Sequence, residues 1–97
     1  MTPCKRLEII IDALHVDDAT QVLRDAGVAG YTVLTYASGW GDRGAREPDG
    51  VSRIFENRVI LCACQPAELD RITPALDPLI RRYGGAVIVS DAQMMSH

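Results

Sequence analysis

The chain has 97 residues, of which 47% are hydrophobic, enough for one small domain with a single core and too few for two. Its formal net charge of −3 argues against binding to nucleic acid or to an anionic membrane surface. No apolar run approaches the roughly 20 residues of a membrane span, and a charged N-terminal segment differs from a signal peptide. Cys4, Cys62 and Cys64 lack the spacing of a disulfide framework, so we expect free thiols in a cytoplasmic protein.

The first part of the chain predicts a strand, a helix and a second strand. LEIIIDAL at residues 7–14 alternates as a strand does. HVDDATQVLRDAG at residues 15–27 predicts an amphipathic helix that Gly27 ends in the left-handed conformation. YTVLTYA at residues 31–37 is rich in residues that favour strands.

The rest of the chain predicts a long loop, a strand, a helix and a last strand. The loop, at about residues 38–53, is rich in glycine and charge and buries little apolar surface, so we expect it to be mobile without a ligand. Residues 54–64 form the next predicted strand, and Pro66 follows as the first residue of a helix. The apolar residues 85–92 predict the last strand.

Two prolines fall inside the predicted second helix. Pro74 and Pro78 each lack an amide donor and crowd the preceding turn. The sequence therefore predicts a kink or break near Thr73, or a new helix start with Thr73 as its N-cap.

The predicted order is β-α-β-β-α-β over a single domain of residues 1–97, which is the ferredoxin-like arrangement of the α+β class. Its four-stranded antiparallel sheet carries both helices on one face and leaves the other face open. Alternation predicts that this open face carries Ile10 with Ile60, Cys62 and Cys64, or the alternate residues. An open apolar face calls for a partner, and self-association is the simplest one.

The sequence offers no catalytic constellation. His15 precedes a helix and His97 is terminal, so neither histidine is expected to be held beside a nucleophile. We therefore expect no enzyme activity and no cofactor. Cys62 and Cys64 lie on one strand face, where thiolates could bind a soft metal, although packing as small apolar residues is the alternative.

Glycines and arginines together indicate anion binding. Gly39-Trp40-Gly41 and Gly84-Gly85 are two places where backbone amides could approach an anion without obstruction from a Cβ atom. Arginine forks match phosphate and carboxylate groups, and arginines lie near both places. They are Arg43, Arg46, Arg53, Arg58, Arg81 and Arg82.

Four segments together resemble the PII signal-transduction superfamily. KRLEIII at residues 5–11 resembles the family's first strand, and residues 16–33 are similar to its first helix and the Gly-x-x-Gly-x-Thr-Val that follows. GWG at residues 39–41 lies where the family has Gly-Phe-Gly at the base of its T-loop, and RVILCACQP at residues 58–66 resembles the strand after that loop. Order and approximate spacing agree over nearly the entire chain.

The resemblance implies a homotrimer with adenine nucleotides bound in the clefts between subunits, and a T-loop that responds to the ligand. Carried over by position, Gly30, Tyr31 and Thr32 form the adenine side of one subunit. The neighbouring subunit supplies Gly39, Trp40, Gly41, Arg58, Gly84 and Gly85.

The sequence departs from the family near the phosphates. RRYGGAV at residues 81–87 replaces the family's Thr-Gly-x-x-Gly-x-Gly-Lys loop, and Ala86 stands in place of a phosphate-binding lysine. The family's Arg-x-Arg segment is missing from QMMSH at residues 93–97. We therefore expect AMP or ADP rather than ATP, with Arg81 or Arg82 as replacement clamps.

A short T-loop without the uridylylated tyrosine is similar to that of carboxysome-associated PII-like proteins, which are linked to inorganic carbon. That subtype implies bicarbonate as a second ligand, and we name Arg46 and Arg53 as its candidate residues. Ordering of the T-loop would then present a surface to a transporter or another partner in carbon uptake.

Two other classes of protein with different functions share the predicted topology. A metal-responsive trimer similar to the CutA-like copper-tolerance proteins would use Cys62 and Cys64. A regulatory module of the ACT type would bind an amino acid, but such modules usually lack a long second hairpin loop.

Overall fold

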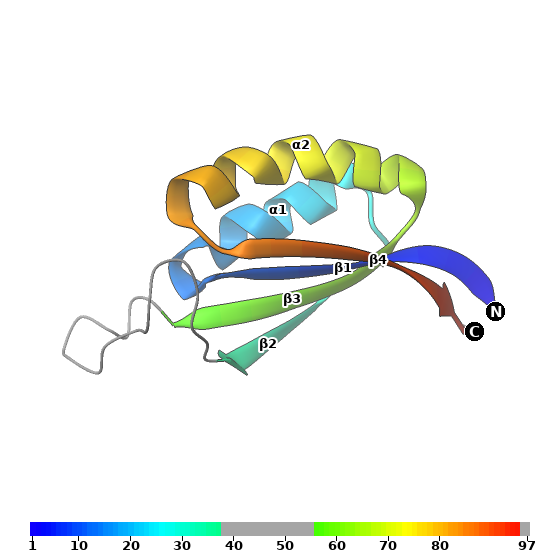
Figure 1. The fold of residues 1–97 in the computed structure, drawn as a ribbon, viewed down its shortest axis with the longest axis horizontal. Coiled ribbons are helices and arrows are strands. Elements are labelled where there is room, and N and C mark those ends of the chain that lie inside the picture. Colours follow the sequence, from blue (N-terminus) through cyan, green and yellow to red (C-terminus); the bar gives the residue numbers. More distant parts are fainter. Residues whose placement is uncertain (38–55, 96–97) are drawn as a thin grey trace.

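A computed structural model describes residues 1–37 and 56–95. They form a four-stranded antiparallel sheet in the order β2-β3-β1-β4, with α1 and α2 packed on one face (Figure 1). The elements in chain order are β1 (Thr2–Asp12), the 3-10 turn η1 (Ala13–His15), α1 (Val16–Ala26), β2 (Thr32–Ala37), β3 (Asn57–Cys64), α2 (Pro66–Tyr83) and β4 (Ala86–Met94). The ferredoxin-like β-α-β-β-α-β fold is confirmed. In this part of the chain, no helix has the length and apolar character to cross a membrane.

The predicted T-loop, at about residues 38–53, lies outside the described residues. With it lie five of the candidate site residues, namely Gly39, Trp40, Gly41, Arg46 and Arg53.

The first strand is longer than predicted. β1 begins at Thr2, because its polar first residues pair with the end of β4, where Thr2 faces Met94. It ends at Asp12, whose carboxylate accepts a hydrogen bond of 3.0 Å from the Leu14 amide and so starts the 3-10 turn. Gly27 ends α1 with φ of 87°, in the predicted left-handed conformation.

The predicted break in the second helix is wrong. α2 runs unbroken from Pro66 to Tyr83, and Thr73 is no N-cap, because its hydroxyl donates a 3.0 Å hydrogen bond to the Leu69 carbonyl within the helix. Pro74 and Pro78 are exposed and four residues apart, so both lie on the solvent side of the helix. Carbonyls that lose an amide donor there can bind water instead, and the helix continues.

The core lies between the sheet and the two helices. Leu7, Ile9 and Ile11 of β1 are fully buried there, as their alternation predicts. Ile72 and Leu76 of α2 and Leu23 of α1 pack onto them as parts of the same cluster.

The predicted assignment of β3 to the open face is wrong for three residues. Ile60, Cys62 and Cys64 lie under the helices, and the two cysteines are 5% and 2% exposed. Ile60 pairs with Ile9, and Cys62 pairs with Leu7, which places them on the buried side of the sheet. Both alternating sets of β3 are apolar, so the pattern alone did not separate the two faces.

The open face carries the alternate residues of β3. Ile10 belongs to it, as predicted, and pairs with Val59 on one side and Ala86 on the other. We define the open face by its apolar residues Ile10, Leu34, Val59, Leu61, Ala63, Ala86, Ile88 and Ala92. Leu34 and Ile88, at its two edges, are 47% and 49% exposed.

Candidate functional site

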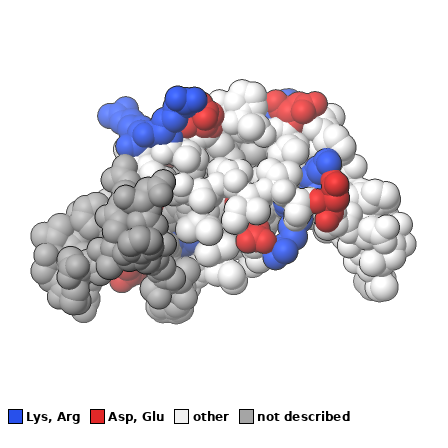
Figure 2. All heavy atoms as spheres, viewed as in Figure 1, with Lys and Arg blue, Asp and Glu red and all other residues white. Residues whose placement is uncertain are grey.

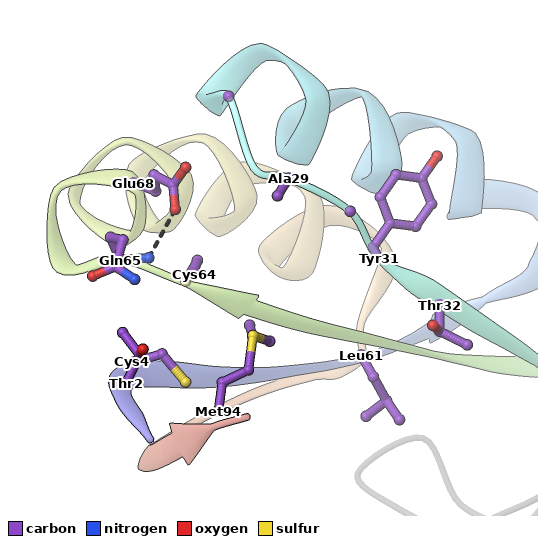
Figure 3. Close-up of a pocket in the computed structure, with 13 residues that line it drawn as sticks. Thr2, Cys4, Ala29, Tyr31, Thr32, Leu61, Cys64, Gln65, Glu68 and Met94 are labelled. Atoms are coloured by element: carbon purple, nitrogen blue, oxygen red, sulfur yellow. Dashed lines mark hydrogen bonds between the residues drawn. The ribbon is translucent and has the colours of Figure 1, made fainter. Parts of the chain in front are cut away.

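A cavity of about 740 Å³ opens at the end of the sheet where β2 begins and β3 ends (Figure 3). One wall is the loop between α1 and β2, from Gly27 to Thr32. The opposite wall is the end of β3 with the first turn of α2, where Cys64, Gln65 and Glu68 lie. Three of the candidate residues, Gly30, Tyr31 and Thr32, therefore line one cavity together. Their part in binding a nucleotide, which the family resemblance implies, stays a prediction.

Gly30 has no structural reason to be glycine within the described chain. Its φ is not positive, and no described atom lies within 4 Å of the position that a Cβ atom would occupy. Since side chains are compatible with this backbone, the missing side chain leaves room at the cavity wall. Close approach of a ligand to the backbone is a common reason for glycine at such a place.

Gly84 and Gly85 differ from Gly30, because the fold itself requires them. They have φ of 82° and 116°, and a Cβ atom on Gly85 would lie 2.3 Å from the carbonyl oxygen of Ile10. Gly84 caps α2, donating its amide to the Ile80 carbonyl at 2.8 Å. Their presence is explained without a bound anion.

The cavity wall is acidic rather than basic. Within the described residues, no lysine or arginine lines it, and Glu68 is its one carboxylate. The Glu68 carboxylate accepts a 2.8 Å hydrogen bond from the backbone amide of Gln65, which forms part of a capping box at the start of α2. A wall of this kind suits an uncharged heterocycle and hydroxyl groups better than a phosphate.

The two buried cysteines are held as neutral thiols. Burial raises the pKa of Cys62 to about 11, with smaller contributions from Cys64 and Glu68, and burial also raises the pKa of Cys64. Cys62 donates a weak hydrogen bond to the Gly30 carbonyl, with 3.4 Å between sulfur and oxygen. Nowhere in residues 1–37 and 56–95 do three or more His, Cys, Asp or Glu residues gather as a metal site.

The other candidate residues that the structure describes lie at the opposite end of the fold. Arg81 and Arg82 lie in the last turn of α2, and Figure 2 shows basic side chains gathered at that end, at the upper left of the molecule. Arg58 begins β3 and pairs with Ile11 of β1, and the Gly84-Gly85 turn precedes the pairing of Ala86 with Ile10. One chain therefore keeps the Gly30 wall apart from these arginines.

The arginines at this end have local partners. Arg81 forms an ion pair of 2.7 Å with Asp77, one helical turn earlier, and Arg58 lies 3.4 Å from Glu56. Arg82 lies over the Tyr83 ring at 5.3 Å. These pairs are exposed, and exposed pairs are weak enough for an anionic ligand to replace them.

Cys64, Gln65 and Glu68 line the cavity but were not predicted from the sequence as site residues. A signal was present in Gln65-Pro-Ala-Glu68, because a capping residue, a proline and an acidic residue mark the start of a helix. No local pattern could show that residues 30 and 65 line the same cavity, because they are far apart along the chain and come together only in the folded protein.

Comparisons with known proteins agree on one family. The family model of nitrogen regulatory protein P-II matches residues 4–96. CPII from Thiomonas intermedia K12, a nitrogen regulatory PII-like protein solved with ADP, AMP and bicarbonate, is 30% identical, with a TM-score of 0.83 over 95% of this chain and 88% of that one. CPII solved with ADP and bicarbonate is 32% identical, with the same TM-score of 0.83 and the same coverage of 95% and 88%.

A more distant structure shows the fold alone. The GlnK–ATP complex of B. subtilis is 18% identical and has a TM-score of 0.67 over 95% of this chain and 84% of that chain. A comparison with curated proteins gave no match.

Proposed function

Because the chain belongs to the nitrogen regulatory protein P-II family and is a PII-like regulatory protein, we propose that it senses adenine nucleotides. AMP or ADP is favoured over ATP, and the ligand occupies clefts between the subunits of a homotrimer. The observation that carries this proposal is the cavity beside Gly30, a glycine that nothing in the described chain requires. The structures of CPII with ADP, at 30% and 32% identity, support the choice of ligand.

The adenosine part of the nucleotide fits the cavity. Backbone groups of Gly30 and Tyr31 and the Thr32 hydroxyl offer donors and acceptors for the base on one side. Glu68 and the absence of basic side chains in the described wall disfavour phosphate there. The base and sugar therefore lie in the cavity, and the phosphates point out of it.

The phosphates need cations, which the described part of this wall lacks, and a neighbouring subunit can supply them. Arg58, Arg81 and Arg82 lie at the far end of the same chain, beyond reach of its own cavity. A second copy could place its own arginines opposite the Gly30 wall and complete the site. The exposed apolar side chains of the open face support such an assembly, because their burial between subunits is favourable.

Bicarbonate is the second ligand of the proposal, and Arg46 and Arg53 are its candidate residues. CPII, which is 32% identical to this chain, was solved with ADP and bicarbonate together. The output is a change in the T-loop at about residues 38–53, recognised by a transporter or another partner in inorganic carbon uptake.

Titration calorimetry of the full chain with AMP, ADP and ATP, each with and without bicarbonate, tests the proposal. We expect ADP or AMP to bind more tightly than ATP, and bicarbonate to increase the affinity for the nucleotide. Arg46→Ala and Arg53→Ala should remove the effect of bicarbonate while leaving nucleotide binding in its absence unchanged. Absence of heat with all three nucleotides would refute the proposal.

A further inference from the structure

The wall of the cavity that carries Gly30 has little backbone support of its own. Between α1 and β2, the 27–31 loop makes two backbone hydrogen bonds in the described chain, from Gly27 to the Arg24 carbonyl at 3.1 Å and from Val28 to the Leu23 carbonyl at 3.4 Å. With the rest of the described chain, residues 29–31 make none outside the strands. A segment with so few internal bonds needs other contacts to keep one conformation.

The strongest contact comes from Arg71 of α2. Its guanidinium donates two hydrogen bonds to the carbonyl of Ala26, from Nη2 at 2.7 Å and from Nε at 3.3 Å. Ala26 is the last residue of α1, so a positive charge binds the negative end of that helix. Arg71 thereby ties α2 to the point where the 27–31 loop begins.

Two further side chains hold the middle and the end of the loop. The buried Cys62 thiol contacts the Gly30 carbonyl at 3.4 Å. Arg24 of α1 donates a 2.6 Å hydrogen bond from Nη1 to the Tyr31 hydroxyl, which points from the loop toward α1 (Figure 3). None of Arg24, Cys62 and Arg71 lines the cavity, so none of them is placed to contact a ligand there.

We propose that Arg71, assisted by Cys62 and Arg24, is a positioning residue that holds the 27–31 loop in the conformation that receives adenosine. This inference rests on the proposed function, since it concerns the same cavity. Without Arg71 the loop samples more conformations, and the nucleotide must order it on binding, which lowers the affinity. The carbonyl of Gly30 and the hydroxyl of Thr32 then meet the base less often in the right arrangement.

The test compares Arg71→Met with Arg71→Lys in the full chain. Methionine keeps the unbranched apolar stem of the side chain and removes both hydrogen bonds, whereas lysine keeps the charge and can make one of them. Asp70→Asn, at the neighbouring exposed position of α2, is the control for a change on the helix surface. The measurements are ADP affinity by calorimetry, thermal midpoint without ligand, and hydrogen exchange of the 28–32 amides without ligand.

We expect Arg71→Met to weaken ADP binding by about fivefold to tenfold, in the range of the net contribution of one ordinary hydrogen bond. Exchange of the loop amides should rise in the same variant, while the amides of β1 stay protected. Arg71→Lys should recover part of the affinity, and Asp70→Asn should resemble the wild type. Partial recovery distinguishes positioning from a general loss of stability.

Cys62 gives a second, independent variant pair. Cys62→Ser keeps a donor near the Gly30 carbonyl, and Cys62→Ala removes it, with similar loss of side-chain volume. Weaker ADP binding in the alanine variant than in the serine variant supports positioning by a hydrogen bond.

Two results would overturn the inference. One is wild-type ADP affinity in Arg71→Met, and the other is unchanged exchange of the loop amides in that variant. Failure of the wild type to bind any adenine nucleotide would instead refute the proposed function, and with it the role of Arg71 in binding.

Discussion

The same substitution, glycine to alanine, should affect folding at Gly85 and ligand binding at Gly30. Gly85→Ala places a Cβ atom 2.3 Å from the Ile10 carbonyl oxygen, at φ of 116°. A residue with a side chain in such a backbone region is destabilised by roughly 1–3 kcal/mol, before the clash is counted. Because the neighbour is backbone of the central β1 strand, it cannot rotate away. We expect a loss of at least about 2 kcal/mol, or roughly 10 °C in the thermal midpoint.

Gly30→Ala should have the opposite profile. No described atom lies within 4 Å of the new Cβ atom, and φ of Gly30 is not positive. Alanine also reduces the conformational entropy of the unfolded chain, which can raise the free energy of unfolding by about 0.4–1 kcal/mol. The thermal midpoint should therefore stay the same or rise slightly. The methyl group would stand at the cavity wall, and we expect ADP affinity to fall about tenfold or more, as for an overfilled contact.

The assay is thermal unfolding by circular dichroism without nucleotide, followed by calorimetric titration with ADP. Wild-type binding by Gly30→Ala would refute the assignment of this wall to the ligand. A Gly30→Ala midpoint as low as that of Gly85→Ala would refute the structural argument, because the two positions would then be equally constrained.

Three further outcomes follow from other parts of the structure. Pro74→Ala restores an amide donor on the exposed side of α2 and should raise the free energy of unfolding by about 1–3 kcal/mol in urea titration, whereas a lower midpoint would contradict the unbroken helix. Burial raises the pKa of Cys62 from its ordinary 9.0 to about 11, so the folded state keeps this proton longer and stability falls as pH rises through that window. Cys62→Ala should show a shallower fall in urea midpoint between those pH values, and equal slopes would count against the buried thiol. Ile88→Asp puts a charge on the open face and should dissociate the proposed trimer in sedimentation velocity, while a trimer that stays intact would show that this face lies outside the contact.

Most of the fold could be predicted from local patterns. Alternation in residues 7–11 identified the buried residues of β1, and Gly27 marked the end of α1, because each pattern depends on neighbours along the chain. The wall formed by Gly30, Tyr31 and Thr32 came from the resemblance to a family, and the structure brings these residues to one cavity. The residues facing them across the cavity, such as Glu68, were not predicted, because the contact is between distant segments.

The sequence by itself determined the order of strands and helices, the glycine that ends α1 and the family, because these depend on periodicity and on short motifs. Only the tertiary structure decided which face of β3 is buried, since Ile60, Cys62 and Cys64 alternate with residues that are also apolar, and the helices cover one set. It also decided that α2 continues through Pro74, because the proline faces water rather than the core. The same packing distinguishes Gly85, where the Ile10 carbonyl leaves no room for a Cβ atom, from Gly30, where no described atom lies within 4 Å of that position.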